Sequence, residues 1–490
     1  MGARARPVQP LTASYDAVVV GSGPNGLAAA TTLAEAGASV LVLEAMETIG
    51  GGLRTEELTL PGFRHDVCAA AHPLGILSPY FSSLPLDRHG LEWVQSPASV
   101  AHPLDGEPAV LSYRSLEHTV AELGEDGERY RRLVAPYVER LDTFIADVLD
   151  PIGIPSHPLL LAKYGLAGLP PATLTARFFR DPRARALFAG CAAHSLLALR
   201  KPLTSAIGLM FMLSAHREGW PIVKGGSAAL AEALAGYLRS LGGRIETGAR
   251  VASLGDLPPA RAYLFDTDPR QLAEIAGSAL PDRYLKRLRR YRYGPGAFKL
   301  DWALDGPIPW EDPRCLQAAT VHLGGSSEEI TASEAAMWKG EHSEDPWILL
   351  VQPSQFDPTR APEGKHSVYA YCHVPHDSTV DMTEAMERQV ERFAPGFRDL
   401  IRGRSAMNTA DFQRHNPNYV GGAYTGGVAD IPQAFARPVA RLDPFSTPND
   451  RLYICSASTF PGGGVHGMCG HLAARSALRS LERHPAAPLG

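Results

Sequence analysis

The chain has 490 residues, of which 45% are hydrophobic and 20% are charged, and its formal net charge is −5. A chain of this length is longer than one ordinary hydrophobic core can serve, which predicts two domains. The composition excludes a disordered chain. The slightly acidic balance argues against nucleic acid as a partner. Six scattered cysteines form no C-x-x-C pair, which favours free thiols in a reducing compartment over a disulfide framework.

The stretch 15–44 has the order of a dinucleotide-binding unit: an apolar strand, a G-x-G-x-x-G motif, an Ala/Leu-rich helix and a second strand. The glycines allow a tight strand-to-helix turn, the approach of a pyrophosphate to the backbone and close packing of helix on strand. Glu44 ends the second strand, where a carboxylate can accept hydrogen bonds from ribose hydroxyls. The alternative is a glycine-rich turn in another α/β unit. The residues of this stretch expected to bind the cofactor are Gly21, Ser22, Gly23, Pro24, Asn25, Gly26, Glu44 and Ala45.

A second glycine cluster, G-G-G-L-R, follows at 50–54. Gly51 and Gly52 permit close approach of the backbone, and Arg54 supplies donors for a phosphate or for the substrate-side wall. The alternative is a surface loop with an exposed arginine. The cluster resembles an extension found in the glutathione-reductase-like family of FAD proteins, and that resemblance implies FAD rather than NAD.

The segment 74–220 changes to proline-punctuated amphipathic patterns. Apolar residues at 130–149 follow helical spacing, and the stretches 159–169 and 196–213 are strongly apolar. One interpretation is a helical core. The other is the wall of an apolar substrate pocket, with a face that touches a membrane.

After Pro221 the pattern returns to the nucleotide-binding style. The sequence K-G-G-S at 224–227 precedes a helix with a leucine stripe, and a short strand and turn follow up to Val251. This arrangement resembles the amine-oxidase and phytoene-desaturase-like flavoproteins, and the resemblance implies that Val251 packs beside the adenine. The stretch 261–268 predicts another strand of the same sheet.

The alternating stretch 297–304 predicts a half-buried strand and, with 347–352 and 367–372, an antiparallel sheet. Lys299 lies on the first of these strands. In amine oxidases a lysine on a substrate-domain strand lies beside the flavin, and this resemblance makes Lys299 a catalytic candidate. The alternative is a solvent-facing lysine.

The last hundred residues hold another glycine-rich signal. A loop at 415–427 contains Tyr424, a buried strand follows at 452–455, and S-T-F-P-G-G-G-V-H-G at 458–467 opens a small-residue helix. A helix N-terminus after a glycine loop favours negative charge, which reduced flavin accumulates at its pyrimidine end. We therefore expect Gly463, Gly464 and Val465 to bind FAD. His466 either faces flavin or substrate or has a structural role.

The motifs N-P-N-Y-V-G-G and S-T-F-P-G-G-G-V-H-G resemble the phytoene desaturase and carotenoid isomerase-like family of the FAD-dependent amino-oxidase superfamily. Within it they are similar to the subgroup of pyridine nucleotide-disulfide oxidoreductase domain-containing protein 2. The resemblance covers 15–479. Because no redox C-x-x-C is present, disulfide chemistry is disfavoured.

The resemblance implies an α/β fold with a glutathione-reductase-like, doubly wound FAD-binding domain and a substrate domain of mixed sheet and helices. The FAD-binding domain would comprise 12–75, 220–268 and 436–490, and the substrate domain 76–219 and 269–435. The implied activity is that of an FAD-dependent oxidoreductase, a desaturase or dehydrogenase removing hydride from a carbon of an apolar substrate. Oxygen, a quinone or another acceptor would take the electrons.

No general base is readable from the sequence, and the catalytic candidates are His466, Lys299 and Tyr424. Three alternatives stay open: a flavin-dependent isomerase, an amine oxidase, for which no aromatic cage is readable, and a non-catalytic lipid- or partner-binding protein. The last follows from the dissociation inhibitors of small GTPases, which reuse this fold without FAD. No metal is expected, since the cluster His466, Cys469 and His471 has no evident fourth ligand. The N-terminus lacks a signal peptide and no stretch is a membrane span, so we expect a cytoplasmic protein, with peripheral membrane contact left open.

Overall fold

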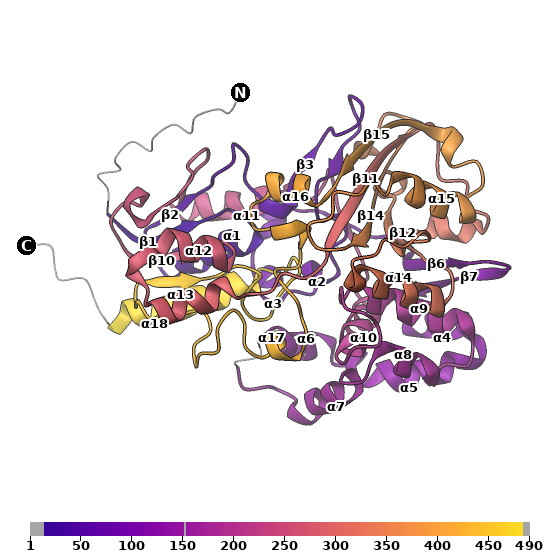
Figure 1. Cartoon of the computed structure of the whole chain (residues 1–490), viewed down its shortest axis with the longest axis horizontal. Helices are drawn as coiled ribbons and strands as arrows, with labels where there is room; N and C mark the ends of the chain where they lie inside the picture. Colours follow the sequence, from indigo (N-terminus) through magenta and orange to yellow (C-terminus); the bar gives the residue numbers. More distant parts are fainter. Residues whose placement is uncertain (1–13, 151–152, 484–490) are drawn as a thin grey trace, which may run out of the picture.

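A computed structural model describes residues 14–150 and 153–483, and two β-sheets with their covering helices dominate it (Figure 1). The described strands are β1 (Tyr15–Val20), β2 (Val40–Leu43), β3 (Thr55–Glu56), β4 (His65–Asp66), β5 (Trp93–Val94), β6 (Ala98–Leu104), β7 (Glu107–Tyr113), β8 (Ile222–Val223), β9 (Arg244–Glu246), β10 (Ala260–Phe265), β11 (Gly296–Leu304), β12 (Ala318–Leu323), β13 (Ile348–Val351), β14 (His366–Val374), β15 (Ile401–Met407) and β16 (Leu452–Ile454). The described α-helices are α1 (Pro24–Glu35), α2 (Pro73–Ile76), α3 (Pro79–Ser83), α4 (Leu116–Glu122), α5 (Gly127–Val138), α6 (Leu141–Leu149), α7 (Pro158–Gly168), α8 (Ala172–Thr175), α9 (Pro182–Ala193), α10 (Thr204–Ser214), α11 (Ala228–Ser240), α12 (Pro269–Ala276), α13 (Asp282–Arg289), α14 (Ser327–Lys339), α15 (Thr383–Phe393), α16 (Thr409–His415), α17 (Ile431–Ala434) and α18 (Met468–Arg483).

The first sheet is parallel and has the strand order β16-β10-β1-β2-β9. Its strands come from three distant parts of the chain, so the dinucleotide-binding half is discontinuous in sequence. The apolar strands are buried on both faces, as expected of a parallel sheet covered by helices on each side. The doubly wound α/β fold is confirmed.

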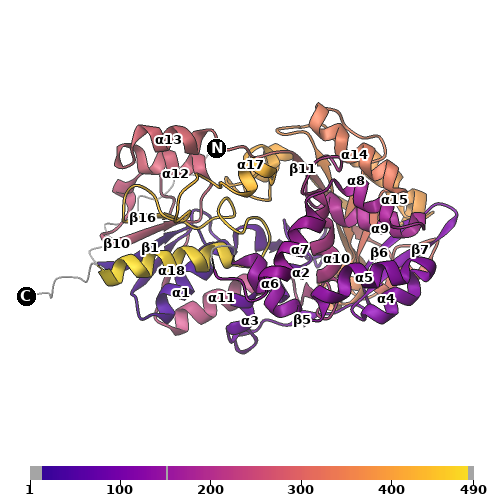
Figure 2. The same cartoon turned by 90° about the horizontal axis from the view of Figure 1, so that it is seen from below.

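Helices cover both faces of this sheet. On one face α1 packs against β1, β2, α11 and α18, and Figure 2 shows α18 lying beside α1. On the other face, apolar residues of α12 and α13 such as Leu272 and Leu288 pack against Val18, Val20 and Leu41. The carboxyl ends of the strands and the N-terminus of α1 therefore meet at one edge.

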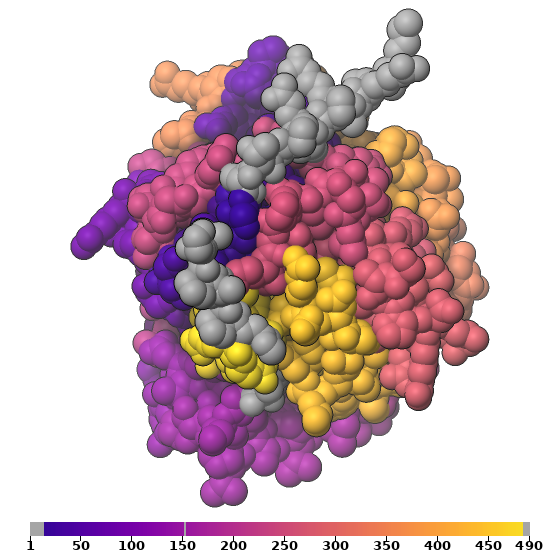
Figure 3. Space-filling model, turned by 90° about the vertical axis from the view of Figure 1, so that its left-hand side faces the viewer, coloured from indigo at the N-terminus to yellow at the C-terminus, as the bar shows by residue number. Residues whose placement is uncertain are grey.

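Helices α12 and α13 lie in 269–435, the range that the sequence assigned to the substrate domain, yet they pack on the first sheet. The reason is local: Asp268 caps α12 by accepting from the Arg270 N–H, and Pro269 starts the helix directly after β10. On the outer surface α13 adjoins the segment before β16 (Figure 3). The Arg441 guanidinium of that segment lies 5.8 Å from the centroid of the Tyr284 ring. The proposed domain boundaries stay a prediction.

The second sheet has the order β15-β11-β14-β13-β12-β6-β7 and is mixed, because β12 pairs with β6 in parallel and the other pairs are antiparallel. The predicted antiparallel sheet is confirmed in the pairing of β11 and β13 with β14. The half-buried character predicted for 297–304 is wrong, since every residue of β11 is buried. One face of β11, at Leu300 and Trp302, shares an apolar core with α15, and the other buries Lys299 and Asp301.

The helical segment departs from its sequence pattern in two places. The stretch 130–149 is divided between α5 and α6, and α7 is largely exposed, with Leu159 87% and Leu166 74% accessible. The core interpretation is therefore wrong for Leu159 and Leu166, although Tyr164 of the same helix is buried in the core. Most of α10 is buried, so the core interpretation is confirmed there. No helix among residues 14–150 and 153–483 is long and apolar enough to span a membrane.

Candidate cofactor and substrate site

A cavity of about 540 Å³ is lined by residues of both halves. We call the part next to α1 the dinucleotide end and the part next to the second sheet the aromatic end. The dinucleotide end is formed by Gly21, Ser22, Gly23, Pro24, Asn25, Glu44, Ala45, Gly51, Gly52, Arg54, Val251, Asp266 and Thr267. The aromatic end is formed by His194, Met210, Phe211, Trp220, Tyr369, Tyr371 and Tyr424.

The turn from β1 to α1 leaves no room for a side chain at Gly23 or Gly26. Gly21 has a φ of +103°, and a Cβ added at Gly26 would lie 2.1 Å from the Gly21 carbonyl oxygen. Pro24 occupies the first turn of α1, where its missing N–H costs no helical hydrogen bond. Backbone N–H groups at the start of α1 are thereby presented to an anion.

Glu44 is held firmly at the end of β2. Its Oε2 accepts from the backbone N–H and the hydroxyl of Ser22 at 2.9 and 2.6 Å, and its Oε1 accepts from the Met46 N–H at 2.9 Å. Arg54 pairs with Oε1 at 3.4 Å and donates to the carbonyl of Thr48, and both charged side chains are buried. The exposed-loop alternative for Arg54 is therefore wrong, and its guanidinium orients the acid.

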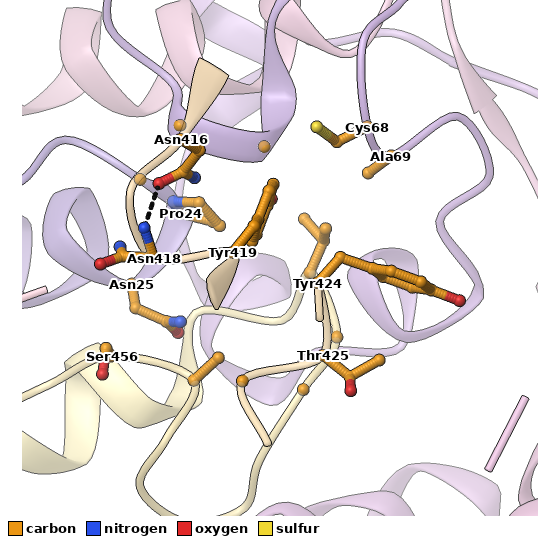
Figure 4. Close-up of a pocket in the computed structure, with 18 of the residues that line it drawn as sticks. Pro24, Asn25, Cys68, Ala69, Asn416, Asn418, Tyr419, Tyr424, Thr425 and Ser456 are labelled. Carbon is orange, nitrogen blue, oxygen red and sulfur yellow. Dashed lines mark hydrogen bonds between the residues drawn. The ribbon is translucent and has the colours of Figure 1, made fainter. Parts of the chain in front are cut away.

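The dinucleotide end has buried polar atoms that a bound dinucleotide could satisfy. Within the described chain, Oδ1 of Asn25 and Oγ1 of Thr267 are buried without a hydrogen-bond partner, and both residues line the cavity. At Gly52 a Cβ would lie 2.3 Å from the Tyr419 hydroxyl, so the second glycine cluster forms a close-fitting wall. In Figure 4, Tyr419 and Tyr424 extend from one loop into the cavity, where the Asn418 N–H donates to Asn416 Oδ1 at 3.1 Å.

The residues predicted to bind the cofactor gather in this cavity, apart from Gly26, which supports the loop from behind. Their binding roles stay predictions. Those that line the cavity from the distant segments are Val251, Gly463, Gly464 and Val465.

His466 follows this C-terminal loop but does not belong to the cavity lining. Its Nδ1 accepts from the Met468 N–H at 3.1 Å, at the start of α18. Burial lowers the pKa of His466 to about 4, so the ring is neutral. The structure thus gives His466 a position that orders the helix start, and its catalytic role stays a prediction.

A chain of three polar side chains, two of them buried and the third half-buried, ends at the aromatic end. The Tyr424 hydroxyl lies 3.1 Å from Nε2 of His373, and Nδ1 of His373 lies 2.9 Å from Oε2 of Glu334. A carboxylate only accepts, so Nδ1–H donates to Glu334 and Nε2 accepts from the Tyr424 O–H. Trp347 stacks on the imidazole at 5.0 Å, and burial raises the pKa of Tyr424 well above its usual value, which keeps the phenol neutral.

Sequence reasoning gave neither His373 nor Glu334 a catalytic role: it considered His373 only as a metal ligand beside Cys372 and His376, and dismissed that site for want of a fourth ligand. They lie 39 residues apart on β14 and α14, and Tyr424 is 51 residues beyond His373. Sequence reasoning likewise showed no aromatic cage, yet Tyr371 and Tyr424 meet with ring centroids 5.4 Å apart. No spacing signal links these residues, because the second sheet brings them together.

Lys299 belongs to a buried ionic cluster. Its ammonium pairs with Asp301 and lies 4.8 Å from the ring centroid of Tyr369, while Arg360 pairs with Asp66 at 2.8 Å. His65 Nδ1 lies 3.5 Å from Asp301, and burial, with the Lys299 and Arg360 charges, lowers the pKa of His65 to about 3. The solvent-facing alternative for Lys299 is wrong. Tyr369, not Lys299, lines the cavity, and a place beside flavin stays a prediction.

A family model described as "NAD(P)-binding Rossmann-like domain" matches residues 19–82. Pyridine nucleotide-disulfide oxidoreductase domain-containing protein 2 of Rattus norvegicus is 27% identical over 96% of this chain and 94% of its own length. A lycopene-forming phytoene desaturase of a Paracoccus species is 24% identical over 94% of this chain and 96% of its own. The chain resembles these proteins over nearly its whole length. The resemblance inferred from its motifs is confirmed.

Among solved structures, a variant of putrescine oxidase aligns with a TM-score of 0.61 at 16% identity, covering 96% of this chain and 99% of that one. Identity at this level shows the shared fold. Together the comparisons show similarity in sequence to oxidoreductases such as phytoene desaturases, and similarity in fold to putrescine oxidase.

Proposed function

We propose that this protein is an FAD-dependent oxidoreductase that dehydrogenates an apolar organic substrate, introducing a double bond. The observation that carries the proposal is the continuity of one cavity, which joins a dinucleotide-binding loop to an apolar aromatic wall. Full-length similarity to phytoene desaturases supports the same assignment. An acceptor such as oxygen or a quinone would complete the reaction.

The chain's own residues would hold FAD along the dinucleotide end. N–H groups of α1 would meet the diphosphate, Glu44 would accept from the ribose, and Val251 would lie against the adenine. Gly463 to Val465 would lie at the flavin ring. Bound FAD would supply a hydride acceptor to the aromatic end.

Dehydrogenation of adjacent carbons releases a proton as well as a hydride, and the aromatic end contains groups that can receive it. Tyr424 would take the substrate proton while passing its phenolic proton to Nε2 of His373. Glu334 would stabilise the resulting imidazolium through the Nδ1–H. The apolar rings around Tyr424 exclude water, which strengthens these charge interactions.

The decisive experiment mixes oxygen-free, FAD-loaded protein with a panel of polyenes, terpenes and cyclic hydrocarbons. Bleaching of the oxidised flavin band, with a product two hydrogens lighter, supports dehydrogenation. Conversion with no added acceptor and no mass change identifies an isomerase instead. A spectrum unchanged by every member of a broad panel contradicts the proposal.

Amine oxidation is the second candidate, and one observation favours it. Tyr369, Tyr371 and Tyr424 place three aromatic rings at the same end of the cavity, where they could surround an amine-bearing carbon. Hydrogen peroxide produced from a panel of amines, without reaction of hydrocarbons, would favour this alternative.

A further inference from the structure

Asp266 is an acidic residue beside the glycine loop between β1 and α1, at which we propose that the FAD diphosphate binds. It follows β10 directly, lines the cavity and is buried. Its Oδ2 accepts from the Gly26 N–H at 2.9 Å and would lie 2.6 Å from a Cβ added at Gly23. One N–H donor at the start of α1, the region that attracts a phosphate, is therefore already used by a carboxyl group.

No cation compensates this carboxyl group. Among the ion pairs of the described residues, none includes Asp266, while Arg54 is committed to Glu44. The titratable groups that face it are Glu44 after β2, the thiol of Cys455 after β16 and the thiol of Cys469 on α18, none of which is a cation. Asp268, on the same segment, is directed to capping α12.

Burial, together with the nearby charge of Glu44, raises the pKa of Asp266 to about 8 against the lowering effect of the Gly26 and Gly23 N–H groups. A diphosphate brought to the same helix end adds negative charge and so disfavours the ionised carboxyl group again. Burial and the added phosphate charge both favour the protonated carboxyl group.

We propose that Asp266 binds the cofactor diphosphate in its protonated form, so that FAD loading takes up a proton at alkaline pH. The inference rests on the proposed FAD function. The proton moves from solvent to the Asp266 carboxylate as the dinucleotide enters, and no other bond changes. Asp266 is thus a cofactor-binding residue that couples loading to pH.

The direction in which FAD affinity changes with pH follows from the linkage of FAD binding to proton binding. Below about pH 8 the carboxyl group of the cofactor-free protein is already neutral, so affinity for FAD is insensitive to pH there. Above it, one proton must be bound for each FAD, and affinity falls by about tenfold per pH unit. In Asp266→Asn the amide is neutral at every pH, and this dependence disappears.

The test is calorimetric titration of the flavin-stripped full chain with FAD, in two buffers of different ionisation enthalpy, at about pH 6.5 and about pH 9. We expect uptake of about one proton per FAD at the higher pH and almost none at the lower. ADP-ribose, which has the same doubly esterified diphosphate but no flavin ring, should show the same uptake, which excludes titration of the ring as the cause.

Asp266→Asn should bind FAD without proton uptake, whereas the matched variant Glu44→Gln should keep the uptake even though its affinity falls. If Asp266→Asn does not fold, the proton uptake of the wild-type protein at the two pH values is by itself a sufficient test of the proposal. FAD binding without proton uptake at about pH 9, or uptake that persists in Asp266→Asn, would overturn this inference and leave the proposed function standing. Failure to bind FAD at either pH would overturn both.

Discussion

The two ends of the cavity are built in different ways. The dinucleotide end is made by backbone: the β1–α1 turn and the second glycine cluster bring the main chain up to the ligand, and Glu44 is held within a few residues of both. The aromatic end is made by side chains from β14, α14 and the loop 416–425, which meet only in the folded protein. A site made by backbone should tolerate the loss of a side-chain hydroxyl but not the addition of a methyl group. A site made by side chains should be sensitive to the loss of a hydroxyl.

The largest effect on FAD binding is expected for Gly26→Ala. The new Cβ would lie 2.1 Å from the Gly21 carbonyl oxygen, so the loop must shift or α1 must move away from β1. We expect the purified variant to retain no FAD and to lose about 1–3 kcal/mol of unfolding free energy. Flavin content and urea denaturation measure both.

Gly165→Ala is the matched control, because a Cβ at this position of α7 meets no atom within 4 Å. The same added methyl group should there leave FAD content unchanged and stabilise slightly through helix propensity. Full flavin content in Gly26→Ala would break the description of this end as a backbone site.

The next effect is expected for Tyr424→Phe, which removes one hydroxyl and keeps the ring. Flavin reduction by the substrate found in the panel should slow by about 10²–10⁴-fold, with FAD content unchanged. His373→Gln should slow flavin reduction by a similar factor. The wild-type rate should show a solvent deuterium isotope effect, and His373→Gln should abolish it, whereas a purely structural role of His373 would leave it in place. Stopped-flow absorbance measures both.

Tyr237→Phe serves as the control for these two variants. Tyr237 lies on α11, and its hydroxyl donates to the exposed carboxylate of Glu35 at the end of α1. It should reduce flavin at the wild-type rate. If Tyr424→Phe matched that rate, proton transfer through His373 would be excluded.

The sequence predicted the dinucleotide end well because its information is local. Strand, glycine motif, helix and acid follow one another within 15–44, and each obeys a rule of backbone geometry. His373 and Glu334 follow no such rule: their distance is set by the register of β14 in the second sheet and by the packing of α14.

Burial was mispredicted for the same reason. Lys299 lies on a strand whose alternation indicated one solvent face. Asp301 on the same strand pairs with it and Asp66 pairs with Arg360, so these charges are compensated although both faces of β11 are buried. Helix α7 has the composition of a core helix, yet its Leu159 and Leu166 side chains are exposed. Tertiary partners, which a single sequence does not display, decide such cases.

Lys299→Met is expected to act on stability and to leave flavin bound. The substitution leaves Asp301 buried next to Asp66 with its counter-charge removed, and burial already raises the pKa of Asp301 to about 6. Loss of one partner of a buried pair costs about 3–5 kcal/mol. Urea denaturation should show this loss and partial recovery in Lys299→Met/Asp301→Asn.

Lys224→Met, which breaks an exposed pair with Glu92, should leave the unfolding free energy nearly unchanged. Equal costs for the two lysines would contradict the buried character of the Lys299 cluster.

The smallest effect is expected for Ser22→Ala at the dinucleotide end. The variant loses the hydroxyl bond to Glu44 but keeps the backbone N–H bond at 2.9 Å, so the acid stays in place. FAD affinity should fall by about tenfold or less, measured by quenching of flavin fluorescence. The exposed Ser240→Ala should change nothing, and a loss as complete as that of Gly26→Ala would mean that side chains form this end as well.

The most direct test of the account is the absorbance spectrum of the purified full chain after incubation with FAD and removal of the excess. A cavity that holds the dinucleotide at one end and substrate at the other predicts an oxidised flavin spectrum, with one FAD released per chain on denaturation. A colourless protein that releases no flavin would contradict the account and leave this fold as a binding protein without redox chemistry.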